Sequence, residues 1–139
     1  LLIESEAHLK GCELGMETFD TGLQVAIDVK QIKQAVLNVM RNAMEAIGDV
    51  QDGRKGRIDV TIRKEGKFAV IAIRDNGKGM DRTTLNRLFD PFFTTKQEGT
   101  GLGLSVSYRI ITNHGGAMHV DSRLGEGTEF IIYLPYVQG

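Results

Sequence analysis

Apolar and polar positions alternate with two different periods along this chain. A period near 3.6 residues over 29–47 predicts a long amphipathic helix, and shorter helical patterns cover 83–89 and 104–113. Residues 1–9 read as the end of a further helix. Alternation with period two predicts strands at 12–19, 58–62 and 68–73, then near 120 and at 130–134.

Turn residues pair these strands as hairpins. Glu65-Gly66-Lys67 joins two of them, and Gly125 and Gly127 lie between the last two. The pattern predicts an α/β (α+β) fold, a two-layer sandwich in which helices cover one face of a mixed, mostly antiparallel sheet. No repeat, low-complexity segment or linker divides the sequence, so we expect a single domain over residues 1–139.

The helix predicted at 29–47 has two unlike faces. Asp28 is placed to cap its start, with Gln31 in capping-box position, and Gly48 to end it. One face is apolar and comprises Ile32, Val36, Val39, Met40, Ala43 and Ile47. The opposite face carries Gln31, Gln34, Asn38, Asn42 and Glu45. Amide oxygens can ligate Mg²⁺ beside phosphates and waters, and the alternative is an ordinary solvated face.

Asp75 ends an apolar strand and is followed by Gly77 and Gly79. A carboxylate at this place can accept a hydrogen bond from an exocyclic amine, while the glycines let a ring approach the backbone. The alternative is an ordinary strand-end turn, because Asp, Asn and Gly all favour turns.

A second glycine motif precedes the helix predicted at 104–113. Gly99, Gly101 and Gly103 alternate with other residues, so their amides and the positive end of the helix form an anion site. The spacing fits neither the P-loop nor the dinucleotide fingerprint, and a flexible hinge is the alternative. Upstream, three phenylalanines within 89–96 indicate a lid that docks by its aromatic rings, with plain core packing as the alternative.

The composition mainly excludes classes of partner and of site. Seventeen lysines and arginines nearly balance eighteen aspartates and glutamates, which gives no indication of nucleic acid or a membrane surface as partner. Nothing in the sequence resembles a membrane span or a signal peptide. The single cysteine, Cys12, and three histidines without metal spacing argue against a disulfide or a zinc site. We expect a cytoplasmic domain, excised from a longer protein that is itself soluble or membrane-anchored.

Taken together, the motifs resemble the catalytic and ATP-binding domain of sensor histidine kinases, within the ATPase group that includes gyrase, Hsp90 and MutL. Five segments carry this resemblance in family order: residues 34–43 (N box), Asp75-x-Gly77-x-Gly79 (G1 box), 89–93 (F box), 99–104 (G2 box) and 125–130 (the terminal motif). The short segment at 92–96 is most similar to kinases of the nitrogen-regulation and sporulation type.

The resemblance implies a role for each matching residue. Asp75 would accept the adenine amine, with Gly79 beneath the base and Thr128 supporting that contact through water, and Gly77 would be a further nucleotide-binding residue of the same motif. Asn42 would ligate Mg²⁺, and Asn38 would lie beside the phosphates of ATP. The triphosphate would be bound by the segment comprising Gly99, Thr100, Gly101, Leu102, Gly103 and Leu104. Arg87 and Lys96 are the basic residues that would reach the γ-phosphate.

The resemblance also implies an activity. Hydrolysing relatives have a glutamate base about where this chain has Asn38, and an amide does not accept a proton at neutral pH. This favours transfer of the γ-phosphoryl to another nucleophile. The family's phosphoacceptor motif, a histidine followed by Glu or Asp and then proline, is absent, because His8 lies in Glu-Ala-His-Leu-Lys. The acceptor histidine would belong to a separate dimerisation domain, which would pass phosphate to a response regulator and leave this domain monomeric.

Two other functions remain open from the sequence. An anti-sigma-factor serine kinase on the same scaffold would phosphorylate a partner protein. A non-catalytic module would use ATP only to switch an interaction. Of the three histidines, His114 is expected to be structural at the end of its helix, and His119 has no evident role.

Overall fold

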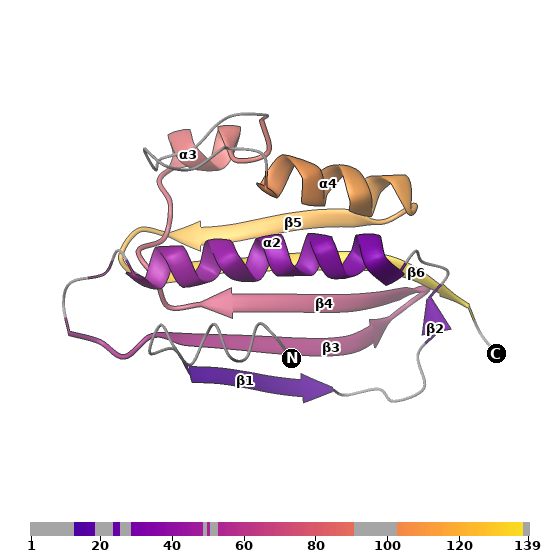
Figure 1. Ribbon diagram of the computed structural model, residues 1–139, viewed down its shortest axis with the longest axis horizontal. Helices are drawn as coiled ribbons and strands as arrows, with labels where there is room; N and C mark the ends of the chain where they lie inside the picture. Colours follow the sequence, from indigo (N-terminus) through magenta and orange to yellow (C-terminus); the bar gives the residue numbers. More distant parts are fainter. Residues whose placement is uncertain are drawn as a thin grey trace.

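A computed structural model describes residues 13–18, 24–25, 29–48, 50, 53–90 and 103–137. The elements are β1 (Glu13–Thr18), β2 (Gln24–Val25), α2 (Val29–Gly48), β3 (Arg57–Glu65), β4 (Phe68–Asp75), α3 (Arg82–Arg87), α4 (Gly103–Asn113), β5 (Ala117–Arg123) and β6 (Gly127–Val137) (Figure 1). None of the helices in these ranges has the length and apolar character needed to cross a bilayer.

The strands form one mixed sheet. β4 lies between β3 and β6, while β5 and β2 both pair with β6, and all these pairs are antiparallel. β1 is added at the β3 edge in parallel. Gly66, with φ of 59°, makes the tight turn between β3 and β4, which only a residue tolerant of the left-handed region adopts readily. The predicted mixed, mostly antiparallel sheet is confirmed.

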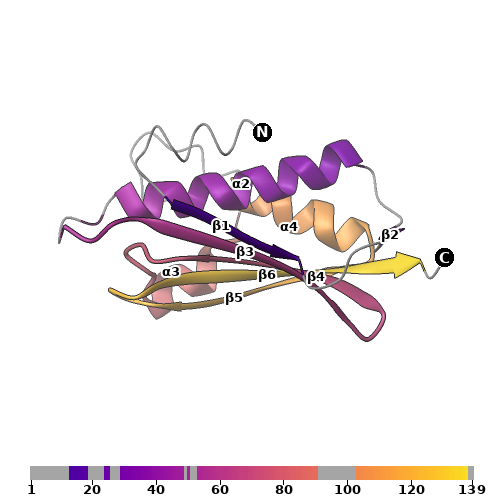
Figure 2. The same cartoon turned by 90° about the horizontal axis from the view of Figure 1, so that it is seen from below.

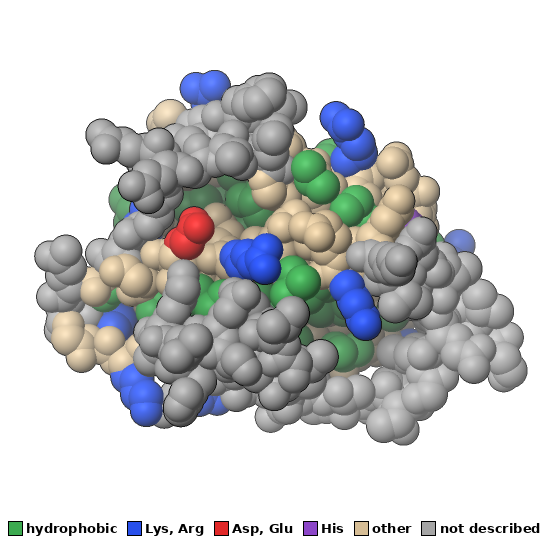
Figure 3. All heavy atoms as spheres, viewed as in Figure 1, with side chains coloured by type: hydrophobic (Ala, Val, Ile, Leu, Met, Phe, Trp, Pro, Cys, Tyr) green, Lys and Arg blue, Asp and Glu red, His purple; other side chains and the backbone are tan. Residues whose placement is uncertain are grey.

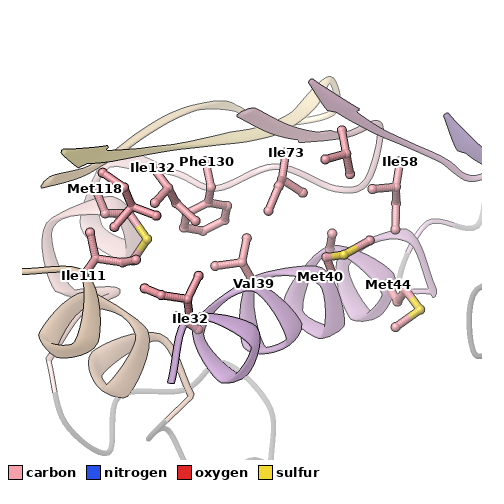
Figure 4. Packing of buried hydrophobic residues seen from close by; sticks show 14 of the residues in the cluster. Ile32, Val39, Met40, Met44, Ile58, Ile73, Ile111, Met118, Phe130 and Ile132 are labelled. Atoms are coloured by element: carbon pink, nitrogen blue, oxygen red, sulfur yellow. The ribbon is translucent and has the colours of Figure 1, made fainter. Parts of the chain in front are cut away.

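Two helices cover one face of this sheet. α2 and α4 lie side by side on it, as Figure 2 shows, while α3 lies outside the β5 edge in Figure 1. The core fills the space between the two layers. Figure 4 labels ten of its side chains: Ile32, Val39, Met40 and Met44 of α2, Ile111 of α4, and Ile58, Ile73, Met118, Phe130 and Ile132 of the sheet. The expected two-layer arrangement therefore holds for the two long helices.

Most predicted boundaries hold within one or two residues, while β3 ends three residues later than expected and β6 is three residues longer at each end. The helix expected at 83–89 spans Arg82–Arg87, and Phe89 lies beyond it in a turn. Asp81 caps its start, where Oδ1 accepts a hydrogen bond from the Thr84 backbone at 2.8 Å and this bond lowers the pKa of the carboxyl. In α2 the buried stripe also includes Ala35 and Met44, which the periodicity did not select. The helix expected at 1–9 and the Asp28 cap lie outside the described residues.

A buried hydroxyl joins α2 to α4. Ser107 has no exposed surface, and its Oγ donates to the backbone oxygen of Ala35 at 2.9 Å while lying 3.1 Å from that of Gly103. α4 supplies the serine and α2 supplies one of the two carbonyls. The bond therefore fixes how the two helices lie against each other.

We expect Ser107→Ala to lower the free energy of unfolding by about 1–2 kcal/mol, because a buried hydrogen bond is lost without its partner being resolvated. Urea unfolding followed by circular dichroism measures the change. Thr112→Ala is the control, since the Thr112 hydroxyl bonds Arg109 at 3.1 Å on the exposed side of α4. Equal losses in the two variants would contradict a special role for Ser107.

Candidate functional site

Asp75 is buried at the end of β4. The period of two places its side chain on the helix-facing side of the sheet with Ile71 and Ile73, and it is 3% exposed. Oδ1 accepts a hydrogen bond from the Gly77 backbone at 2.8 Å. Oδ2 is buried and has no hydrogen-bond partner among the described residues. A buried acceptor without a donor costs about 1–3 kcal/mol, so its retention points to a ligand that supplies the donor.

Burial raises the pKa of the Asp75 carboxyl to about 6, because desolvation disfavours the charged form. The backbone N–H groups of Gly77 and Thr128 oppose this effect, and that of Thr128 does so without completing a hydrogen bond to Oδ2. At neutral pH the group is mostly ionised. It therefore presents an acceptor and not a donor to its surroundings.

Thr128 is the cross-strand partner of Asp75 and is 4% exposed. Its Oγ1 lies 2.7 Å from Oγ of Ser122 on β5, which also accepts a hydrogen bond from the Met80 backbone at 2.8 Å. Sequence reasoning found Thr128 only through the family resemblance, and it missed Ser122. The signal was present in the alternation of Met118, Val120 and Ser122, which places all three on the inner face.

The loop after Asp75 has no room for side chains at its two glycines. A Cβ on Gly77 would lie 2.7 Å from the Ala46 backbone carbon in α2. Gly79 has φ of 70°, and a Cβ there would overlap the backbone oxygen of Arg123. These contacts give both glycines a packing reason. The expectation that these glycines let the adenine ring approach the backbone stays a prediction.

Asn76, within the same loop, holds it to the start of β3. Its side-chain Nδ2 donates to the Lys55 oxygen at 2.9 Å, and its Oδ1 accepts from the Arg57 backbone at 2.8 Å. The Asn76 backbone N–H also donates to the Arg57 oxygen at 3.2 Å. From the sequence this residue was only a turn former, because the pattern does not show which distant backbone an amide side chain reaches.

The polar face of α2 reaches the start of α4. Asn38 Nδ2 donates to the Gly103 oxygen at 3.1 Å, and its Oδ1 accepts from Gln34 at 3.0 Å. Asn42, one turn further on, is half-buried, and its side chain makes no hydrogen bond to the part of the chain that the structure describes. The structure therefore brings Asn38 to the N-terminal end of α4, where backbone N–H groups and the helix dipole favour an anion.

Several predicted site residues lie outside the described residues, namely Lys96, Gly99, Thr100, Gly101, Leu102 and the phenylalanines at 92 and 93. Leu104 is described, and it packs against the core. Phe89 stacks on Tyr108 of α4 with ring centroids 4.8 Å apart and also packs against the core, as the core-packing alternative expects, while a docking lid stays a prediction. Arg87 is exposed, lies 3.5 Å from Asp90 and makes a further interaction, so it already has partners.

Charge on the helix-bearing face suits an anionic ligand. The described charged side chains that show in Figure 3, which views this face, are mostly Lys and Arg. No group of three His, Cys, Asp or Glu residues within the described ranges is arranged to hold a metal ion. The Asn42 amide, which the family resemblance assigned to Mg²⁺, stays a candidate ligand. His114 is structural as expected, since its Nδ1 lies 2.7 Å from the Ile110 oxygen, and His119 packs edge-on against Tyr133.

The raised pKa of Asp75 makes stability depend on pH. The carboxyl titrates near its ordinary value of 3.8 when unfolded and near 6 when folded, so the folded state binds more protons between these values. Stability from this group is therefore highest at low pH and falls as pH rises through that window. We expect Asp75→Asn to be more stable than the parent at neutral pH by up to about 3 kcal/mol, and the difference to vanish near pH 4.

Urea unfolding at a series of pH values measures this difference. Asp59→Asn is the control, because the Asp59 side chain is 41% exposed and pairs with Arg57 at 2.8 Å. A gain of the same size and pH dependence in both variants would show that burial of Asp75 is not its cause.

Comparison with known proteins agrees with this geometry. The family model described as histidine kinase-, DNA gyrase B-, and HSP90-like ATPase matches residues 27–138. Sporulation kinase A of Bacillus subtilis is 37% identical over 134 residues, which are 96% of this chain and 21% of that protein. The chain thus spans about a fifth of the length of that relative.

Solved structures give the same result. The catalytic domain of the histidine kinase ThkA superposes with a TM-score of 0.82 at 32% identity, covering 96% of this chain and 85% of that one. Full-length ShkA in complex with AMPPNP superposes with a TM-score of 0.83 at 27% identity, covering 99% of this chain and 28% of that one. The chain belongs to the histidine kinase-, DNA gyrase B-, and HSP90-like ATPase family and corresponds within it to the ATP-binding catalytic domain of a sensor histidine kinase.

Proposed function

We propose that this domain binds MgATP with the adenine at Asp75 and transfers the γ-phosphoryl group to a histidine on a separate domain. The observation that carries the proposal is the buried Oδ2 of Asp75, which has no hydrogen-bond partner among the described residues. An ionised carboxylate in this position demands an N–H or O–H donor. The exocyclic amine of adenine supplies one, whereas the carbonyl oxygen at the same place in guanine would be repelled.

The phosphates would lie toward the start of α4. The backbone N–H groups there have no helical partners, and Asn38 holds Gly103 against α2. Supporting this, the glycine-rich segment Gly99–Leu104 ends at that helix start. We assign its amides, including those of Gly101, Gly103 and Leu104, to the triphosphate. Arg87 and Lys96 are the proposed contacts to the γ-phosphate.

Asn42 is the residue we assign to Mg²⁺. Its amide is half-buried, bears no charge and makes no hydrogen bond to the described residues, which fits a ligand position on a cation otherwise bound by phosphates and water. Bound there, the ion would neutralise charge on the phosphate oxygens as the phosphoryl group leaves. This assignment is supported by the family resemblance and by an Asn42 amide that makes no hydrogen bond to the described residues.

The polar face of α2 favours transfer over hydrolysis. Both side-chain atoms of Asn38 are already in hydrogen bonds, its oxygen with Gln34 and its nitrogen with Gly103. An amide is also not a general base at neutral pH, so this residue does not activate water. The domain would instead position ATP for attack by an imidazole, with catalysis by alignment and charge neutralisation.

The acceptor and the later partner are assigned by analogy. ThkA has a solved structure in complex with the response regulator TrrA. The kinase in that structure aligns with 98% of this chain at a TM-score of 0.79. We propose the same order here: ATP, then a histidine on a dimerisation domain, then a response regulator, with this domain in the cytoplasm where ATP is available. No observation favours the serine kinase or the non-catalytic module, and the assay below separates all three.

Asp75→Asn is expected to abolish ATP binding measured by calorimetry. With its oxygen bonded to the Gly77 N–H, the new amide would place an NH₂ where Oδ2 lies, and two donors cannot pair. Because this variant is expected to be the more stable, lost binding would not reflect unfolding. Radiolabelled γ-phosphate mixed with a separately produced histidine domain should then give acid-labile phosphate with the parent only. Acid-stable phosphoserine on a partner, or binding without transfer, would favour the alternatives.

Asn42→Ala is expected to remove the effect of Mg²⁺ on ATP affinity. The parent should bind ATP at least tenfold more tightly with Mg²⁺ than with a chelator, whereas the variant should bind equally weakly in both conditions. Asn113→Ala, at the exposed far end of α4, is the matched control and should behave as the parent. If Asn42→Ala retains the full Mg²⁺ effect, the ion is bound by other residues.

A further inference from the structure

Among the described residues, the hydroxyl of Ser122 has three neighbours within hydrogen-bond distance. The Met80 backbone N–H donates to it at 2.8 Å, the Gly127 backbone oxygen lies 3.0 Å away, and Thr128 Oγ1 lies 2.7 Å away. A serine hydroxyl has one proton and can accept two hydrogen bonds. Three neighbours therefore use its full capacity, and the direction of each bond can be worked out.

The Gly127 carbonyl can only accept, so the single proton of Ser122 goes to it. The Met80 N–H can only donate, and it takes one of the two lone pairs of Ser122. The contact with Thr128 is then a hydrogen bond only if the Thr128 hydroxyl donates its proton to Ser122 Oγ. The opposite choice would leave two oxygens of Ser122 and Gly127 facing each other at 3.0 Å with no proton between them.

We infer that Ser122 is a positioning residue that fixes the Thr128 hydroxyl as a hydrogen-bond acceptor toward the nucleotide base. With its proton held by Ser122, the Thr128 hydroxyl has no proton to give to Asp75, its cross-strand partner. Oδ2 of Asp75 and Oγ1 of Thr128 then form a pair of buried acceptors. Such a pair selects a ligand group that brings two protons, either an amine or an amine together with a water that it orders.

This inference rests on the proposed function, because it assumes that the base lies at Asp75. The inference adds a second determinant of base selection, the Thr128 hydroxyl held by Ser122, to the Asp75 carboxylate. A 6-amino purine satisfies the two acceptors, whereas a 6-oxo purine places a third acceptor against them. Without Ser122, the Thr128 hydroxyl is free to turn its proton toward Asp75 or toward a 6-oxo group. The first outcome weakens the binding of ATP, and the second strengthens the binding of ITP. Both reduce the preference for ATP relative to the parent.

The test is the ratio of the dissociation constants for ITP and ATP, measured by calorimetry on the same chain. We expect Ser122→Ala to lower this ratio by about tenfold, the size of one hydrogen bond, while Ser122→Thr keeps the hydroxyl and the parent's ratio. Ser107→Ala is the matched control. It removes another serine hydroxyl with backbone partners, and it should lower stability without changing the ratio.

An unchanged ratio in folded Ser122→Ala, or an equal fall in Ser107→Ala, would overturn the inference. If Ser122→Ala does not fold, Thr128→Val and Thr128→Ser decide instead. Thr128→Val loses the acceptor and should lower the ratio, whereas Thr128→Ser keeps the acceptor and should keep the parent's ratio. Equal ratios in the two variants would overturn the inference. Failure of the proposed function would look different, because the parent itself would then bind neither nucleotide or would not prefer ATP.

Discussion

The loop from Asn76 to Met80 passes between the end of α2 and the β5–β6 turn at backbone-to-backbone distance, and the rest of the site depends on this contact. The Lys78 N–H donates to the Ala46 oxygen at 3.2 Å, and the Lys78 oxygen accepts from the Gly125 N–H at 2.7 Å. Such an approach excludes a Cβ at Gly77 and at Gly79. The glycines thus let one short loop join the helix layer to the last hairpin, and Asp75 directly precedes this loop.

α2 sets the distance between the two ends of the site. Asn38 bonds the start of α4, Ala46 bonds the loop after Asp75, and Asn42 lies midway between them on the same helix face. Eight residues of helix correspond to a rise of about 12 Å. Because one continuous helix fixes all three positions, the proposed base end, metal ligand and phosphate end cannot shift relative to one another without breaking α2 or its contacts.

Much of this arrangement could be predicted from the sequence, because it follows from periodicity and turn chemistry. The 3.6 period located α2, the period of two located every described strand except the two-residue β2, and Glu65-Gly66-Lys67 located the first hairpin. What escaped prediction depends on tertiary contacts. The Asn76 amide reaches backbone some twenty residues away, at Lys55 and Arg57, and Ser107 reaches α2. A polar residue in a short pattern gives no sign of which distant carbonyl or N–H it will meet.

The site residues divide along the same line. Asp75, Asn42 and the glycines were identified because their spacing matches a family, whereas the network of Ser122, Thr128 and Met80 emerges only when β5 and β6 pair. That network explains why a carboxylate can remain partly unsatisfied in a well-packed protein. Three donors near the carboxyl are used in other hydrogen bonds: the Gly77 N–H bonds Oδ1, the Met80 N–H bonds Ser122, and the Thr128 hydroxyl gives its proton to Ser122. Oδ2 is thereby left without a hydrogen bond from the described residues, which is the property that a ligand with a donor group would use under the proposed function.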